Sequence, residues 1–168
     1  MLQTIIGKRG RGKTSLAAEL IASQKRDQIF IFDYMGEFRS FAIEGFCFVE
    51  SDSSNFSKFM VDLWKRSQEE ISTLVVLDEI ASYCKPWSEA ESQINHLYRL
   101  GRHKGIDAIS INQRFYGMPP IIRSQTDIFS LFQVTEPRDV LYLQKLVSPQ
   151  VLETLMHLGM FEYINISL

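Results

Sequence analysis

The feature that most constrains this chain is the glycine-rich stretch Gly7-Lys-Arg-Gly-Arg-Gly-Lys-Thr14. It matches the Walker A pattern GxxxxGK[ST], in which backbone N–H groups turn inward around phosphate oxygens and a following helix directs its positive end at the bound anion. Such a loop needs a strand before it and a helix after it. Leu2–Ile6 is a short apolar run, and residues 14–22 carry apolar side chains at helical spacing, so the sequence meets both requirements.

The Walker A pattern assigns roles within the loop. Lys13 is expected to reach the β- and γ-phosphates of a nucleoside triphosphate, and the Thr14 hydroxyl is expected to bind Mg²⁺. The pattern does not determine where the three variable cations Lys8, Arg9 and Arg11 point. The alternatives are the γ-phosphate, acids of a neighbouring subunit such as Asp33 or Glu37, and solvent. The predicted nucleotide-binding set is Gly7, Lys8, Arg9, Gly10, Arg11, Gly12, Lys13, Thr14 and Ser15.

An acidic pair follows the apolar run Thr73–Leu77, whose continuous apolarity suits a parallel strand covered on both faces. Asp78 is predicted to support Mg²⁺, and Glu79 is predicted to act as the general base toward water. A helix start with acids in its first turn is the alternative for this pair. Gln113 follows the next strand and is predicted to reach the γ-phosphate or the attacking water, with a solvated loop amide as its alternative.

Strand and helix patterns alternate along the chain. We expect strands at 2–6, 28–32, 45–49, 73–77, 107–111, 127–132 and 160–166. We expect helices at 14–22, 55–72, 88–101, 139–146 and 149–158, and a break at Pro119-Pro120. This alternation predicts an α/β fold with a mostly parallel sheet, in one domain over residues 1–168.

The formal net charge of −2 gives no overall attraction to nucleic acid, so any basic surface must be local. One segment, residues 99–125, holds five cations against the single acid Asp107. We expect it to follow DNA phosphates without reading sequence, although a solvated helix face explains it as well. Phe115 and Tyr116 suit base stacking or core packing equally. The five cations are Arg99, Arg102, Lys104, Arg114 and Arg123.

Cysteine usage and hydropathy bear on the compartment. Cys47 and Cys84 have no metal-binding spacing, so we expect free thiols in a reducing compartment. No apolar run approaches the roughly 18–20 residues that cross a bilayer, and no signal peptide precedes the glycine loop. A soluble intracellular protein without a transmembrane segment is therefore expected.

Taken together, the motifs resemble the FtsK–HerA superfamily of P-loop motor ATPases. Within it they are similar to the genome-packaging ATPases of membrane-containing viruses with double-jelly-roll capsids. The resemblance covers roughly residues 2–132. Beyond the loop and the acidic pair, it rests on Asp33-Tyr-Met-Gly-Glu-Phe38 and on Arg99-x-x-Arg102-x-x-x-Gly105 leading into Asn112-Gln113-Arg114. Met35 departs from the pattern, which is often basic at that position.

This resemblance implies a RecA-like P-loop NTPase core of the additional-strand, conserved-glutamate type. Helices would flank the sheet on both faces, with a strand inserted between the Walker A and Walker B strands. ATP and Mg²⁺ are the implied cofactors, and Gln113 the sensor-like residue. A neighbouring subunit would supply an arginine, with Arg102 the first choice, Arg99 the second and Arg123 the third. Asp33 and Glu37 would support the site or contact a subunit.

The implied function is ATP hydrolysis that drives translocation of double-stranded DNA, or single-stranded viral DNA, most specifically into a preformed viral capsid. The implied partners are further copies in a hexameric ring and a capsid-vertex or membrane-associated viral protein. The implied location is the host cytoplasm or a capsid vertex. Alternatives are a phage assembly, extrusion or conjugation-type ATPase acting at a membrane, and a small-molecule phosphotransferase. Asp78, Glu79 and Gln113 disfavour the phosphotransferase, and Glu79 disfavours a nucleotide switch without turnover.

Overall fold

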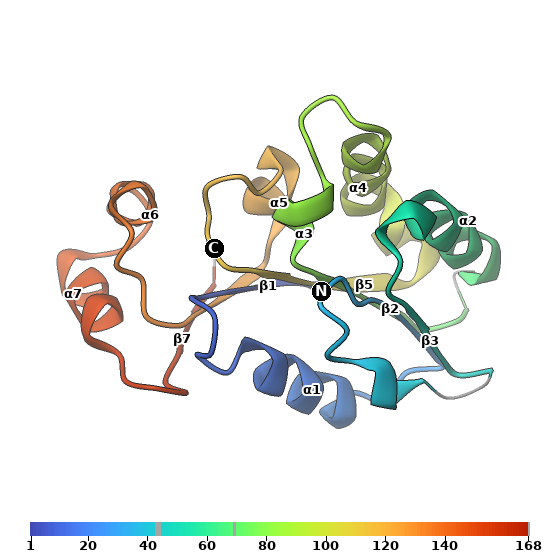
Figure 1. Cartoon of the computed structure of the whole chain (residues 1–168), viewed down its shortest axis with the longest axis horizontal. Helices are drawn as coiled ribbons and strands as arrows, with labels where there is room; N and C mark the ends of the chain where they lie inside the picture. Colours follow the sequence, from blue (N-terminus) through green and yellow to red (C-terminus); the bar gives the residue numbers. More distant parts are fainter. Residues whose placement is uncertain (43–44, 69, 168) are drawn as a thin grey trace.

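The computed structural model describes residues 1–42, 45–68 and 70–167. Its centre is a seven-stranded sheet with the order β3-β2-β4-β5-β1-β6-β7 (Figure 1). The strands are β1 Leu2–Ile6, β2 Gln28–Phe32, β3 Cys47–Glu50, β4 Thr73–Asp78, β5 Ile106–Asn112, β6 Ile128–Leu131 and β7 Ile164–Ser167.

The strands from β3 to β6 pair in parallel, and β7 pairs antiparallel with β6. β5 lies between β1 and β4, which confirms the inserted strand that the family resemblance implied. Because parallel strands end at the same edge, the segments that follow β1, β2, β4 and β5 all emerge there. This carboxyl edge brings the glycine loop, the Asp33–Phe38 block, the acidic pair and Gln113 together.

Helices cover both faces of the sheet, as the sequence predicted. In Figure 1, α1 lies on one face, and α2 to α5 lie on the other. Figure 1 also shows α6 and α7 at the β7 end of the molecule. None of the helices in the described part of the chain is long and apolar enough to cross a bilayer. Their bounds are α1 Lys13–Ser23, α2 Phe56–Arg66, α3 Ile80–Tyr83, α4 Glu89–Leu100, α5 Pro120–Gln125, α6 Pro137–Leu143 and α7 Pro149–His157.

Each face of the sheet has its own apolar core. Alternate side chains of a strand point to opposite faces, so Ile5 packs with Leu16 of α1 while Ile6 packs with the α2–α5 layer. The same alternation holds in β4, where Val76 faces α1 and Leu77 faces the other layer. The two cores hold the carboxyl edge rigidly, because every central strand is anchored on both sides.

The helix expected over residues 55–72 is shorter than predicted. α2 ends at Arg66, and Ser67 has extended backbone angles. The Ser67 hydroxyl donates to the Leu63 carbonyl at 2.8 Å, an interaction that competes with continuation of the helix. The chain then returns toward Thr73 to begin β4, and Glu69 lies outside the described residues.

Prolines begin helices that the sequence analysis missed or started too late. Pro120 occupies the first turn of α5, where no helix was expected, and Pro137 begins α6 two residues before the predicted start. Proline is tolerated there because the first helical N–H groups have no partner within the helix. The last strand is shorter than predicted, since β7 begins at Ile164 and residues 160–163 form a turn instead.

Cys47 and Cys84 are both buried free thiols, as the sequence analysis predicted. Burial raises the pKa of the Cys47 thiol to about 11. It raises the pKa of the Cys84 thiol to about 12, so neither carries reactive thiolate near neutral pH.

Candidate functional site

A cleft opens at the carboxyl edge of the sheet, over the loop between β1 and α1. Most of the predicted site residues converge on it, including the acidic pair and Gln113. Gly7, Lys8 and Arg11 of the predicted set are not among the described lining residues. Two lining residues that the sequence analysis did not assign to the site join it, Met35 and Phe161. Glu37, which the resemblance implied would support the site or contact a subunit, also lines the cleft. The cleft is lined by Arg9, Gly10, Gly12, Lys13, Thr14, Ser15, Met35, Glu37, Asp78, Glu79, Gln113 and Phe161.

Two glycines of the loop are required by geometry. Gly12 has φ 101°, a left-handed conformation that a side chain disfavours. A Cβ on Gly7 would stand 2.5 Å from the Cβ of buried Phe132, closer than two carbon atoms approach. The loop therefore curls tightly over the end of β1, and its backbone is free to approach an anion.

Lys13 is the buried cation of the cleft. Its ammonium group donates to the carbonyl of Lys8 at 3.2 Å, across the mouth of the loop. Burial lowers the pKa of Lys13, while Glu79, Asp78 and Glu37 oppose that shift. A cation held among three acidic side chains, above the glycine backbone, is placed to bind a phosphate group.

Asp78 ends β4 and is buried, with its carboxylate accepting from the backbone N–H of Met35 at 3.2 Å. Burial raises the pKa of Asp78 to about 7, against that hydrogen bond, and the neighbouring carboxylates add to the rise. The group is thus poised to bind a cation that would relieve this repulsion.

Glu79 follows Asp78 and has left-handed backbone angles, φ 48° and ψ 49°. A non-glycine residue in this region costs about 1–2 kcal/mol, and such strain concentrates at functional sites. Burial raises the pKa of Glu79, while Lys13 and hydrogen bonds from Gln113 lower it. Gln113 therefore contacts the predicted general base from the end of β5, the strand paired with β4.

Asp33 positions the turn that follows β2. Its fully buried carboxylate accepts from the backbone N–H of Glu37 at 2.8 Å and from that of Phe38 at 2.9 Å. The subunit-contact hypothesis for Asp33 is wrong, because the side chain is inside the molecule. The turn directs Glu37 into the cleft, where its carboxylate accepts from the Thr14 hydroxyl.

The variable cations of the loop face three directions. Arg9 lines the cleft, whereas Arg11 donates to the side-chain oxygen of Gln133 in the segment after β6. Lys8 is exposed and borders a small cavity that Gln113 and Gln133 also line. Of the three, only Arg9 is a lining residue of the cleft.

The candidate trans arginines lie outside the cleft of their own chain. Arg102, in the short 3₁₀ helix Gly101–Lys104, donates to both carboxylate oxygens of Asp127 at 2.6 Å. That pair sits at the amino edge of the sheet, next to the start of β5 at Ile106. At 3.3 Å per residue, β5 separates this edge from the carboxyl edge by about 20 Å. Arg99 is exposed on α4, and Arg123 lies over the Tyr142 ring, 5.4 Å from its centre. A role in a neighbouring subunit stays a prediction for all three.

The basic segment 99–125 does not form one patch. Arg102 lies at the amino edge, whereas Arg114 lies beyond the carboxyl end of β5, 3.5 Å from Glu136. Phe115 is buried between Phe129 and Tyr142, with ring centres 5.5 and 5.0 Å away, so it packs in the core and is not free to stack on bases.

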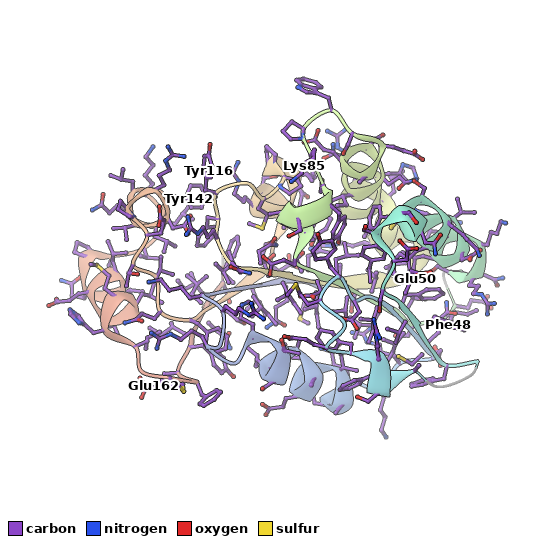
Figure 2. All side chains as sticks on the ribbon, viewed as in Figure 1. Phe48, Glu50, Lys85, Tyr116, Tyr142 and Glu162 are labelled. Atoms are coloured by element: carbon purple, nitrogen blue, oxygen red, sulfur yellow. The ribbon has the colours of Figure 1, made fainter. Side chains whose placement is uncertain are left out.

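Tyr116, the next residue, is 62% exposed. The Arg138 guanidinium lies 4.6 Å from the centre of its ring. Figure 2 shows Tyr116 and Tyr142 on the same side of the sheet, beside α6. Of the two aromatic residues considered for base stacking, only Tyr116 has an accessible ring.

The residues present fit Mg²⁺ as a shared ligand of protein and phosphate. Thr14 and Asp78 offer the hydroxyl and carboxylate oxygens that Mg²⁺ prefers. Within residues 1–42, 45–68 and 70–167, no group of three or more acidic, histidine or cysteine side chains is arranged to hold a metal ion. A site completed by substrate phosphates and water needs no such protein cage.

Asp78→Asn is expected to change how stability depends on pH. The folded-state pKa of about 7 lies above the ordinary 3.8, so the folded protein binds this proton more tightly than the unfolded chain. Its contribution is therefore lost as pH rises from about 4 to about 7. The difference in unfolding free energy, variant minus parent, should grow by about 2–3 kcal/mol between pH 5 and pH 8. Urea unfolding of the nucleotide-free proteins measures this difference, and parallel pH curves would contradict it.

Comparison with known proteins shows which solved structures share this fold. No protein-family model matches the sequence, and no curated protein is detectably similar to it in sequence. Among solved structures, the genome packaging NTPase B204 from Sulfolobus turreted icosahedral virus 2, in complex with ATP-γS, matches with a TM-score of 0.81 and 20% identity over 99% of this chain and 91% of that chain. The chain therefore shares the α/β fold of this packaging NTPase, as the resemblance to FtsK–HerA P-loop ATPases implied.

More distant structures share this fold as part of larger proteins. EssC (ATPases 2 and 3) from Geobacillus thermodenitrificans matches with a TM-score of 0.61 and 18% identity over 76% of this chain and 31% of that chain. The pCW3 conjugation coupling protein TcpA matches with a TM-score of 0.65 and 15% identity over 82% of this chain and 50% of that chain. At these identities the likeness establishes the fold, and it confirms the predicted RecA-like α/β architecture.

Proposed function

We propose that this chain is an ATPase that uses Mg²⁺ and couples hydrolysis to movement of DNA. One observation carries the ATPase assignment. The glycine loop with buried Lys13, the acidic pair Asp78-Glu79 and Gln113 meet in one cleft, although they lie far apart in the sequence. The neighbour B204 was solved with ATP-γS and with AMPPCP, which supports nucleotide binding by a protein of this fold.

The proposed reaction is attack of water on the γ-phosphorus of ATP. Lys13 and the loop N–H groups hold the β- and γ-phosphates, and Glu79 takes the proton from the attacking water as the bond to the β–γ bridging oxygen breaks. The upward shift of the Glu79 pKa makes its carboxylate a stronger base, while Gln113 orients it. Mg²⁺ bound at Thr14 and Asp78 would neutralise charge that develops on the phosphate oxygens.

We propose that an arginine from a neighbouring subunit completes the site. Arg9 of the loop lines the described cleft, whereas none of the three candidate arginines lines it in its own chain. Such a residue contributes on the order of 10³–10⁵ in rate in related chemistry. We propose a ring, with six subunits as the expected number. Arg102 is the first candidate for this arginine if the salt bridge to Asp127 opens on assembly.

Packaging of a viral genome into a preformed capsid is the most specific form of the proposal. The B204 structures, described as those of a genome packaging NTPase and a DNA-packaging ATPase, support it. Partners would be double-stranded or single-stranded viral DNA and a capsid-vertex or membrane-associated protein, in the host cytoplasm or at a capsid vertex. A conjugation-type motor is the second candidate, because TcpA shares the fold.

The test is phosphate release by the purified protein, measured with and without DNA over a range of protein concentrations. A ring motor should show turnover per subunit that rises cooperatively with concentration and increases with DNA. DNA stimulation should fall steeply between about 50 and 200 mM salt, as expected for phosphate contacts. Preference for double-stranded DNA favours packaging of a double-stranded genome, whereas preference for single-stranded DNA fits both packaging of a single-stranded genome and a conjugation-type motor. If turnover per subunit depends on neither DNA nor protein concentration, the proposal of a ring motor is wrong.

A further inference from the structure

Phe161 places an aromatic ring on the rim of the cleft. It lies in the connection between α7 and β7, and its Cδ1 stands 2.6 Å from the position of a Cβ on Gly12. The absence of a side chain at Gly12 therefore lets the ring lie directly on the loop. The residue is 62% exposed, so much of the ring remains open to solvent.

The surrounding structure holds the backbone of the turn that carries this ring. Phe161 has φ 64°, an unfavourable angle for a bulky residue that must be imposed by its neighbours. The Gly159 N–H donates to the Glu162 carboxylate at 2.6 Å and closes the turn. Tyr163 packs against Phe132, with ring centres 5.5 Å apart, and β7 then pairs with β6. Figure 2 shows Glu162 in this connection, on the α1 side of the sheet.

The strand order places Phe161 opposite the acidic pair. Asp78 and Glu79 follow β4, Gln113 follows β5, and Glu37 follows β2; all of these strands lie on one side of β1. Phe161 precedes β7, which lies on the other side. A triphosphate whose γ-phosphate meets the acids would extend across the loop, so its ribose and base would reach the Phe161 side.

We propose that Phe161 is the platform on which the base of the bound nucleotide stacks. This inference rests on the nucleotide-binding role proposed above and adds how the base is recognised. Stacking uses the π face that every base has, and it tolerates different edge groups. The site would therefore prefer purines for their larger rings, bind ATP and GTP within about threefold of each other, and bind CTP and UTP more weakly.

The experiment separates base contacts from phosphate contacts. Dissociation constants are measured by calorimetry, with Mg²⁺, for ATP and for inorganic tripolyphosphate, which has no base. Phe161→Ala should weaken ATP about tenfold and leave tripolyphosphate within twofold. Phe161→Tyr should restore ATP binding, because the ring is kept. Met160→Ala is the matched control, since Met160 is an adjacent apolar residue that is 64% exposed.

Four results would overturn the inference. Equal weakening of ATP and tripolyphosphate would mean that the ring only shapes the loop. Unchanged binding of both would mean that the base lies elsewhere. If the parent protein binds tripolyphosphate as tightly as ATP, the base platform fails while the phosphate site stands. If the parent binds neither, the nucleotide-binding function itself fails, and the platform falls with it.

Discussion

Glu79→Gln is expected to reduce ATP turnover by a factor of 10² to 10⁴ while leaving ATP affinity within about threefold, because general-base catalysis contributes that much to rate. Glutamine fills the same space but takes no proton from water. Its side-chain oxygen still accepts a hydrogen bond, so the contact with Gln113 can persist and Gln113 stays in place. Single-turnover phosphate release measures the loss directly, and calorimetry with a non-hydrolysable ATP analogue measures the affinity.

Two further variants isolate the chemical role of Glu79. Glu19→Gln removes a carboxylate from the exposed side of α1 and should leave turnover unchanged. Glu79→Asp keeps the charge but shortens the reach by one methylene, so it should retain a small part of the activity. Retention of more than a tenth of the parent rate by Glu79→Gln would show that another group accepts the proton.

Lys13→Met is expected to weaken ATP binding about 100-fold and to abolish turnover at millimolar ATP. Methionine matches the length of lysine but removes the charge-assisted hydrogen bonds to phosphate, each worth about 1.5–3 kcal/mol. The substitution also removes the positive charge that lowers the pKa of Glu79. The pKa of Glu79 should therefore rise further in the variant. Equilibrium binding at pH 8 separates loss of the cation from protonation of the acids.

Lys25→Met provides the control for Lys13→Met. Lys25 is exposed just beyond the end of α1, so its loss changes net charge by the same amount without touching the cleft. Its ATP affinity should match that of the parent. A Lys13→Met protein that binds ATP within threefold of the parent would show that the loop backbone alone holds the phosphates.

The sequence by itself predicted the parts of the site that depend on local chemistry. The loop was recognisable in the sequence because its geometry requires glycine at two positions. The backbone of Gly12 is left-handed, and Gly7 lies too close to Phe132 to carry a side chain. The position of Asp78 and Glu79 could be predicted because a continuous apolar run is typical of a buried parallel strand. Acids directly after such a run lie at the carboxyl edge of the sheet. The same alternation of strands and helices predicted the α/β fold.

The tertiary structure alone decided which distant segments share the cleft. Glu37 enters it because buried Asp33 fixes the turn after β2, and Phe161 enters it because β7 pairs with β6 at the far side of the loop. No local pattern marks Phe161, and for Glu37 the family resemblance left open whether it supports the site or contacts a subunit, since both placements depend on strand order and on packing between segments far apart in the chain. For the same reason the cations of residues 99–125, contiguous in sequence, separate to opposite edges of the sheet along β5.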